Sequence, residues 1–295
     1  MGWLTNRYNK KTSKKYGWEP AWFDAEKFDS FLEQKVKDFQ NLHEDLEADG
    51  KVGIKTYRRI LLARKIDLPE DNTVFHNHAL LVNGEFKKID WPKIKVHLLD
   101  KKCFRKSKRL RKPSLIVTHW DVCKSANACR KVLAKRNIST HFVIDNDGTI
   151  VQLVDTNDIA WHARGSNNNS IGIDISSAYY LKYADYYEKK GFGKRPTVSN
   201  SRVHGVKLKP HLGYYPLQVK AYKKLIEFLT KEYPIPLEYP KQKDGSQVRG
   251  VHKPASQGKF KGVVHHYHLT RNKIDTSGFP LEEIVDKIKI KGSED

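Results

Sequence analysis

The chain has few cysteines and no long apolar run. Only three cysteines occur among its 295 residues, an odd number and too few for a framework of disulfides: Cys103, Cys123 and Cys129. No stretch approaches the roughly 18 consecutive apolar residues that a membrane-spanning helix needs. The first residues also lack the apolar run of a signal peptide. We therefore expect no transmembrane segment, no signal peptide and at most one disulfide.

Acidic side chains are scarce relative to basic ones. Lys and Arg number 55 and Asp and Glu 34, which gives a formal net charge of +21. Such a surface attracts anionic partners, among which nucleic acids, lipid headgroups and cell-wall polymers are all candidates. The apolar share of 38%, with 11% aromatics, is sufficient for a folded core.

The chain begins with a basic segment and a helical region. Residues 1–17 carry five basic side chains and no acidic one, so residues 1–24 are predicted to be a basic arm without a fixed fold. Residues 25–70 are predicted to form a small helical domain. Its first helix has apolar side chains at helical spacing, namely Phe28, Phe31, Leu32, Val36 and Phe39. A glycine-containing turn follows, and a second helix begins near Thr56.

This helical region resembles the peptidoglycan-binding module found beside many wall hydrolases. The resemblance covers VKDFQNLHEDLEADGKVGIKTYRRIL, and its motif positions are occupied by Gln40, Asp49, Gly50, Gly53 and Thr56. The resemblance implies a module that binds the bacterial cell wall. The alternative is a helical hairpin that only packs on the main domain.

Residues 75–290 are predicted to be an α/β domain, with a mixed central sheet flanked by helices. Asn83-Gly84 between apolar runs predicts a β-hairpin at its start, and Asp147-Gly148 predicts another. The basic run at 101–112, with eight basic groups and no acid, is typical of an exposed connection. An apolar stripe from Leu217 to Leu229 predicts a long helix. Short Ile- and Val-rich runs predict the strands of the sheet: SLIVTHW, THFVID, TIVQLV, SIGIDI and GVVHHYHL.

Two of these strands end in histidine. His119 closes LIVT, and His265 follows GVV, with Asp275 ten residues later in a loop. A single histidine on a strand is usually structural. Two histidines and a carboxylate, however, are the three ligands that a hydrolytic zinc site takes from a protein while leaving a fourth position for water.

Three segments together resemble the type-2 N-acetylmuramoyl-L-alanine amidases, which are relatives of the peptidoglycan recognition proteins. They are THW, HFVIDNDGTIVQLVDTNDIAWHARGSNNNSIGIDIS and HHYHLTRNKID, within residues 114–280. The resemblance implies a zinc ion held by His119, His265 and Asp275. The family usually has one histidine at the second position, whereas this chain also has His266 and His268 nearby.

The resemblance also implies the catalytic and substrate-binding residues. Asp174 matches the general base, Lys273 the cation that stabilises the oxyanion, and His162 and Asn169 contact the substrate. Thr140 stands where some members have tyrosine, so no phenol takes part. The alternatives are a locally hydrogen-bonded Asp174 and a solvated Lys273. Cys123 and Cys129 have the spacing of a local disulfide in peptidoglycan recognition proteins, and buried reduced thiols are the alternative.

Together these features predict a monomeric phage-type endolysin that hydrolyses peptidoglycan. We expect it to stay in the host cytoplasm until lysis, and its charge to draw it to the anionic cell envelope. A non-catalytic recognition protein is the alternative. A nuclease or other nucleic-acid protein is a third hypothesis, but no DNA-binding motif supports specific nucleic-acid binding. The segment 179–212 has no predicted role.

Overall fold

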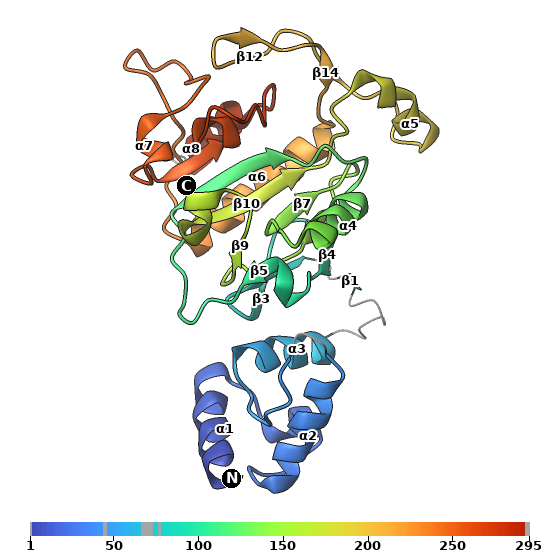
Figure 1. Cartoon of the computed structure of the whole chain (residues 1–295), viewed down its shortest axis with the longest axis vertical. Coiled ribbons are helices and arrows are strands. Elements are labelled where there is room, and N and C mark those ends of the chain that lie inside the picture. Colours follow the sequence, from blue (N-terminus) through green and yellow to red (C-terminus); the bar gives the residue numbers. More distant parts are fainter. Residues whose placement is uncertain (1, 44–45, 66–72, 76–77, 293–295) are drawn as a thin grey trace. The chain divides into compact units, whose positions relative to one another are not determined.

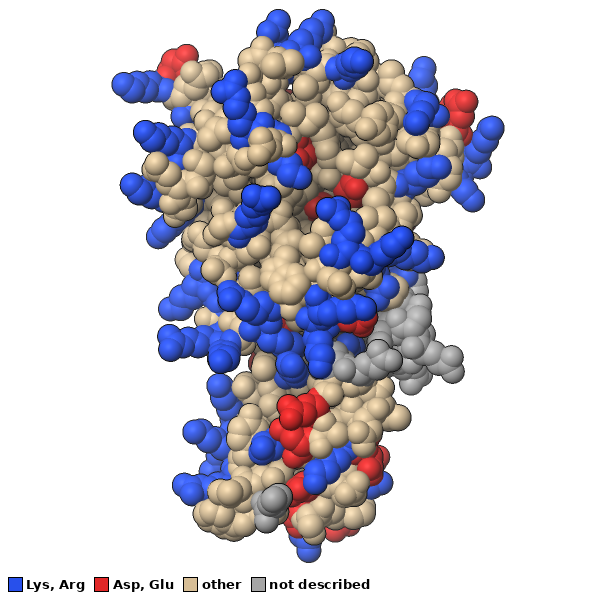
Figure 2. All heavy atoms as spheres, viewed as in Figure 1, with Lys and Arg blue, Asp and Glu red and all other residues tan. Residues whose placement is uncertain are grey.

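The structure is a computed structural model that describes residues 2–43, 46–65, 73–75 and 78–292. Contacts divide the chain into two compact units, Met1–Val74 with Leu81–Lys87, and Phe75–Leu80 with Lys88–Asp295. Within the described residues, no helix is both long and apolar enough to cross a bilayer. Lys and Arg side chains are scattered over the visible surface of both units (Figure 2).

The N-terminal unit is helical from its first described residues. It contains α1 (Gly2–Tyr16), η1 (Pro20–Phe23), α2 (Ser30–Asn41) and α3 (Ile54–Lys65). The prediction of an unfolded arm over residues 1–24 is therefore wrong. The reason is that α1 buries polar side chains, Asn9 and Thr12, which an apolar pattern cannot reveal. Trp18 is fully buried and donates from Nε1 to Thr12 Oγ1 at 3.2 Å.

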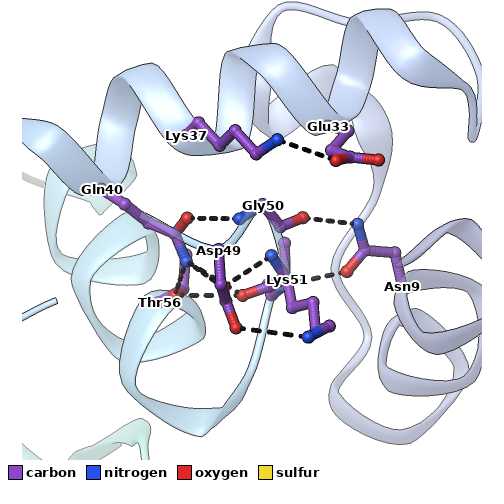
Figure 3. Close-up of polar contacts among 9 residues, drawn as sticks. Asn9, Glu33, Lys37, Gln40, Asp49, Gly50, Lys51 and Thr56 are labelled. Atoms are coloured by element: carbon purple, nitrogen blue, oxygen red, sulfur yellow. Dashed lines mark hydrogen bonds and ion pairs between the residues drawn. The ribbon is translucent and has the colours of Figure 1, made fainter. Parts of the chain in front are cut away.

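Residues at the positions that resemble a peptidoglycan-binding module bond to one another inside this unit (Figure 3). Gln40 Nε2 lies 3.1 Å from Asp49 Oδ1 and 3.0 Å from Thr56 Oγ1, and its Oε1 accepts from Gly50 N at 2.9 Å. Asn9 donates to Gly50 O at 3.0 Å. Gly50 has a φ of +73°, and a Cβ there would lie 2.6 Å from Glu33 Cγ. These motif residues therefore fix the turn between α2 and α3.

The predicted hairpin at Asn83-Gly84 is confirmed. Strands β2 (Ala79–Val82) and β3 (Glu85–Lys88) pair around it. Asn83 and Gly84 have φ values of 53° and 85°, the two positive values that a type I′ turn requires. Residues 81–87 group with the N-terminal unit, so the hairpin does not simply open the second domain.

The second unit is built on a seven-stranded mixed sheet with the order β1-β4-β8-β7-β10-β6-β15 (Figure 1). Strands β6, β10 and β15 are parallel neighbours, β10 is also parallel to β7, and β8 is antiparallel to β7. The strand bounds are β1 (Thr73–Phe75), β4 (Ile94–His97), β6 (Leu115–Trp120), β7 (Phe142–Ile144), β8 (Ile150–Gln152), β10 (Ser170–Ile175) and β15 (Gly262–His265).

Helices cover both faces of this sheet, which confirms the predicted α/β class (Figure 1). Helix α4 (Ala126–Arg136) packs Cys129 and Leu133 against Val143 of β7. Helix α6 (Pro216–Glu232) lies on the opposite face, where the hydroxyl of Tyr222 is 2.5 Å from Thr118 Oγ1 of β6. Helix α8 (Leu281–Gly292) contacts α6 and β15.

Shorter elements complete the second unit. They are η2 (Lys101–Cys103), β5 (Phe104–Arg105), β9 (Ile159–Ala160), η3 (Arg164–Asn169), η4 (Leu181–Tyr183), α5 (Ala184–Lys189), β11 (Thr197–Val198), β12 (Arg202–Val203), β13 (Val206–Lys207), β14 (His211–Leu212), α7 (Lys253–Ser256) and η5 (His266–His268). The segment 179–212 is anchored by buried Arg195, which donates to Asn146 Oδ1 at 2.6 Å and to Ser176 O at 2.7 Å.

The basic run at 101–112 is not wholly exposed, contrary to the prediction. Cys103 and Phe104 are buried, and so is Arg111. The Arg111 guanidinium donates to the carbonyls of Thr156 at 2.9 Å and Ser170 at 2.7 Å, and also to the carbonyl of Asp158. Burial lowers the pKa of Arg111 to about 10, which leaves it charged at neutral pH. Charge patterning could not show that backbone carbonyls would surround this one member of the run.

Replacing Arg111 with methionine should therefore destabilise the second unit. The buried carbonyls would lose their donors, and each unsatisfied group costs about 1–3 kcal/mol. We expect the free energy of unfolding, measured by denaturant titration, to fall by about 3–5 kcal/mol. The matched control is Arg109→Met on an exposed residue of the same run. An equal, small change in both variants would contradict this role for Arg111.

Candidate metal centre and active site

The carboxyl ends of three parallel strands bring the polar residues of the site together. His119 is near the end of β6 and lies opposite Asp174 of β10 in the register of the sheet. On the other side of β6, β15 ends at His265. Because parallel strands share the edge at which they end, side chains that are remote in sequence meet there.

His119, His266 and Asp275 converge on one point. His119 Nδ1 is 3.0 Å from His266 Nδ1 and 3.2 Å from Asp275 Oδ2, and His266 Nδ1 is 2.9 Å from the same oxygen. All three side chains are buried. Ligand atoms on a tetrahedral zinc ion, about 2.0–2.1 Å from the metal, lie roughly 3.3 Å apart. The donor set and its spacing therefore fit a zinc ion with three protein ligands.

His265, predicted as the second ligand, points to the other face of the sheet. It lies opposite Thr118, whose hydroxyl bonds Tyr222 of α6, and paired residues of adjacent strands project from the same face. His265 Nδ1 is 2.6 Å from Thr276 Oγ1, and its Nε2 is 3.2 Å from Glu282 Oε1 of α8. The structure thus replaces His265 with His266 beside His119.

A chain of hydrogen bonds orients His119 from behind. Its Nε2 is 2.9 Å from His162 Nδ1, and His162 Nε2 is 3.1 Å from Ser170 Oγ, which donates to Ser166 O at 2.6 Å. Because Ser170 Oγ donates to Ser166 O, it accepts from the Nε2–H of His162. The Nδ1 of His162 then accepts from the Nε2–H of His119. This order leaves the lone pair of His119 Nδ1 facing His266 and Asp275, as a metal ligand requires.

His162 was predicted to contact the substrate, and in the structure it supports His119. Gly172 makes room for it, because a Cβ at this position would lie 2.7 Å from His162 Cγ. Asn167 holds the chain before η3 by accepting from the backbone N–H of His162 at 3.1 Å and of Ala163 at 2.6 Å. No sequence signal distinguished Asn167 from the adjacent asparagines.

Replacing His162 with alanine should weaken zinc binding by about 10–100-fold, because His119 would lose the partner that fixes its orientation. Competition with a chromogenic chelator would measure the dissociation constant. His252→Ala is a suitable control, since His252 packs against Phe260 outside the network. Unchanged affinity in the His162 variant would instead favour the predicted role in substrate binding.

Burial and charge set the protonation states of the ligands. Burial and the neighbouring His266 lower the pKa of His119 to about 4, so its imidazole is neutral at pH 7. For Asp275, burial raises the pKa, but the neighbouring side chains of His119 and His266 outweigh burial and hold the pKa well below its usual range. A neutral imidazole and an ionised carboxylate are the forms that bind a metal ion.

Asp174 lines a cavity of about 220 Å³ together with all three clustered residues and Lys273. Its carboxylate is buried and accepts from Cys129 Sγ at 3.7 Å. Burial, followed by the charges of Asp121 and Asp275, raises the pKa of Asp174 well above its usual range. A dication bound nearby would counteract that shift. Asp174 is therefore placed to exchange a proton with a molecule in this cavity.

Lys273 is exposed at the rim, where it lines this cavity and a second one of about 450 Å³. The two cavities also share His162, His266 and Arg136, so they adjoin each other. Thr140 Oγ1 is buried in the first cavity's wall with no hydrogen-bond partner among the described residues. Asn169 lines neither cavity, and its carbonyl accepts from Ser114 N at 2.9 Å.

The two cysteines of the candidate disulfide are free thiols in the structure. Cys123 is partly exposed and Cys129 is buried. Both line the 220 Å³ cavity, and only Cys129 is buried, as the alternative from the sequence required of both.

Residues 109–277 match the N-acetylmuramoyl-L-alanine amidase family (Amidase_2), and the chain belongs to this family. The match contains every residue of the cluster. None of the curated proteins matches the chain.

Several solved structures are similar to it. The amidase LysC from Clostridium intestinale is 18% identical, with 67% of this chain and 98% of that one covered and a TM-score of 0.41. The Ph2119 endolysin of a Thermus scotoductus bacteriophage is 17% identical, covering 62% and 88%, with a TM-score of 0.36. AmpDh3 from Pseudomonas aeruginosa, in complex with anhydromuramic pentapeptide, is 21% identical, covering 64% and 65%, with a TM-score of 0.38.

Proposed function

We propose that the protein is a zinc-dependent amidase that cleaves the bond between N-acetylmuramic acid and L-alanine in peptidoglycan. The observation that carries the proposal is the convergence of His119 Nδ1, His266 Nδ1 and Asp275 Oδ2 within 3.2 Å of one another. This cluster lies in a depression lined by a buried carboxylate and a lysine, inside the segment that matches the amidase family.

His119, His266 and Asp275 would hold the ion, with His266 in place of the predicted His265. When bound there, zinc supplies a Lewis acid and a water of lowered pKa. The ionised Asp275 offsets part of the ion's charge. The chain from His119 through His162 to Ser170 holds the first ligand in a single orientation.

Asp174 is the residue that would manage protons. Its carboxylate would accept a proton from the attacking water and then deliver it to the nitrogen of the leaving L-alanine. Burial suits this duty, because it raises the pKa of the carboxyl toward the working range of a general base. The ammonium of Lys273 at the rim would stabilise negative charge that develops on the carbonyl oxygen of the lactyl amide.

The wider role we propose is that of a phage-type endolysin. It would remain in the host cytoplasm until it is released to the wall at lysis, and it would act as a monomer. Its charge of +21 would attract it to anionic envelope polymers. The N-terminal unit would bind the wall through surfaces other than the motif side chains, which are engaged with one another in the unit's interior.

Digestion of purified peptidoglycan tests the reaction, with the protein assayed before and after chelation and mass analysis of the fragments. We expect intact glycan and free L-alanine amino termini, lost on chelation and restored by zinc. Cleavage within the glycan or between stem residues would refute the bond assignment. Binding without cleavage would favour a non-catalytic recognition protein, and steeply salt-dependent DNA binding without zinc would favour a nucleic-acid protein.

A further inference from the structure

A second group of metal-ligating side chains lies in the same 220 Å³ cavity as the first. Asp121, Cys123 and Cys129 each offer a ligand atom, and these atoms lie within 4.8 Å of one another. Both cysteines are free thiols. Two thiols and a carboxylate differ in chemistry from the two imidazoles and a carboxylate of the first cluster, because thiolates favour softer metal ions.

Asp121 is already oriented as a metal ligand would be. Its Oδ1 accepts from the backbone N–H of Cys123 at 2.8 Å and of Ser177 at 3.1 Å, and its Oδ2 accepts from Ser176 Oγ at 2.8 Å. A carboxylate has about four acceptor positions, so one on Oδ2 remains for an ion. Hydrogen bonds of this kind usually fix the carboxylates that bind metals.

The Asp174 carboxylate offers a further metal-ligating oxygen beside Cys129. Its Oδ2 is 3.7 Å from Cys129 Sγ. A sulfur and an oxygen on one tetrahedral zinc ion, with Zn–S of about 2.3 Å and Zn–O of about 2.0 Å, are separated by roughly 3.5 Å. The distance between Asp174 Oδ2 and Cys129 Sγ is therefore close to that between two ligands of one ion.

We propose that Asp121, Cys123 and Cys129 form a second site for a soft divalent ion, and that occupancy of this site inhibits hydrolysis through Asp174. Binding forms two metal–sulfur bonds and releases both thiol protons to solvent. Cys129, once a ligand, no longer donates a proton to the Asp174 carboxylate. The ion instead attracts that carboxylate and removes it from proton transfer. The binding step stands by itself, whereas the inhibition rests on the proposed function of Asp174.

Cadmium titration of the full-length protein tests the binding step. The apo-protein is kept reduced by a phosphine, and a thiol assay first checks that it has three free thiols. Cadmium is then added while the ultraviolet absorption band of cadmium–thiolate bonds is followed. Native mass spectrometry then counts the ions per chain. We expect two ions in the wild-type protein and a thiolate band that Cys123→Ser removes together with one ion. Cys103→Ser is the matched control, since Cys103 is the remaining free cysteine and is buried outside this cavity.

The first cluster provides the second arm of the experiment. His266→Ala should lose one ion and keep the thiolate band. A single ion without a thiolate band in the wild-type protein would overturn the inference and leave the proposed function intact. A thiolate band that persists in Cys123→Ser would also overturn it. If the wild-type protein binds a single ion with a thiolate band, and His266→Ala changes neither, this result would support the second site. It would count against the metal centre of the proposed function.

Activity measurements test the inhibition. Excess zinc should lower peptidoglycan hydrolysis by the wild-type protein about a hundredfold, the contribution expected of a general base. In the Cys123→Ser variant, the rate of hydrolysis in excess zinc should equal the rate of the same variant at one equivalent of zinc. Equal inhibition of the two proteins would overturn the proposed link between the second site and Asp174.

Discussion

Replacing His266 with alanine is expected to abolish zinc retention and to lower peptidoglycan hydrolysis by about a thousandfold or more. The metal supplies several kcal/mol of transition-state stabilisation, and each 1.4 kcal/mol or so corresponds to a factor of about ten. His266 Nδ1 lies between His119 Nδ1 at 3.0 Å and Asp275 Oδ2 at 2.9 Å, so its removal leaves only two ligands. Elemental analysis after dialysis and a dye-release assay measure the two effects.

His265→Ala is the matched control, because the two histidines are adjacent and both buried. This variant should retain zinc and most of its activity. It should be less stable by about 1–3 kcal/mol, since Glu282 loses a buried hydrogen-bond partner. His265→Gln, which can still bond Glu282, should recover part of that stability. Loss of zinc in His265→Ala with retention in His266→Ala would show that the ligand assignment from the sequence was the correct one.

Replacing Asp174 with asparagine should keep zinc bound while lowering kcat by about 10²–10⁴-fold. The asparagine side chain has nearly the same shape and could still accept from Cys129 Sγ, but it cannot take a proton from water. Asp174 lies in the same cavity as the clustered residues without belonging to the cluster, which is why metal content should not change.

The control for this variant is Asp185→Asn on the exposed surface of α5. It removes the same charge away from the cavity and should leave kcat unchanged. Near-normal turnover by the Asp174 variant would refute the general-base assignment, and the amidase proposal would survive with another proton acceptor. Loss of zinc from the Asp174 variant would mean that Asp174 helps to hold the ion.

Local sequence patterns were sufficient for much of the fold. The Ile- and Val-rich runs became strands of the central sheet, and Asn83-Gly84 formed a turn because its two positive φ values suit those residues. His119 and Asp275 were found because a strand end and a following loop are places where ligands gather, and the family resemblance supplied their partner positions. These features depend on a few neighbouring residues, so they can be recognised in the sequence.

Packing decided the features that the sequence left open or misassigned. The residues of β15 are buried on both faces, so no alternation of apolar and polar residues marks the face that carries the site. A difference of one residue exchanges His265 for His266. Arg111 was assigned to an exposed connection and Asn9 to an arm without a fixed fold, because burial of a polar group depends on distant partners, here the carbonyls of Ser170 and Gly50.

The sequence by itself therefore determined the kinds of element, the chemistry of the ligands and the family of the chain, since these follow from short patterns. Only the tertiary structure decided which histidine faces Asp275, what supports His119 and where the thiols of Cys123 and Cys129 lie. Each of these depends on strand register and on side chains that are far apart in the chain, and such contacts exist only once the sheet has formed.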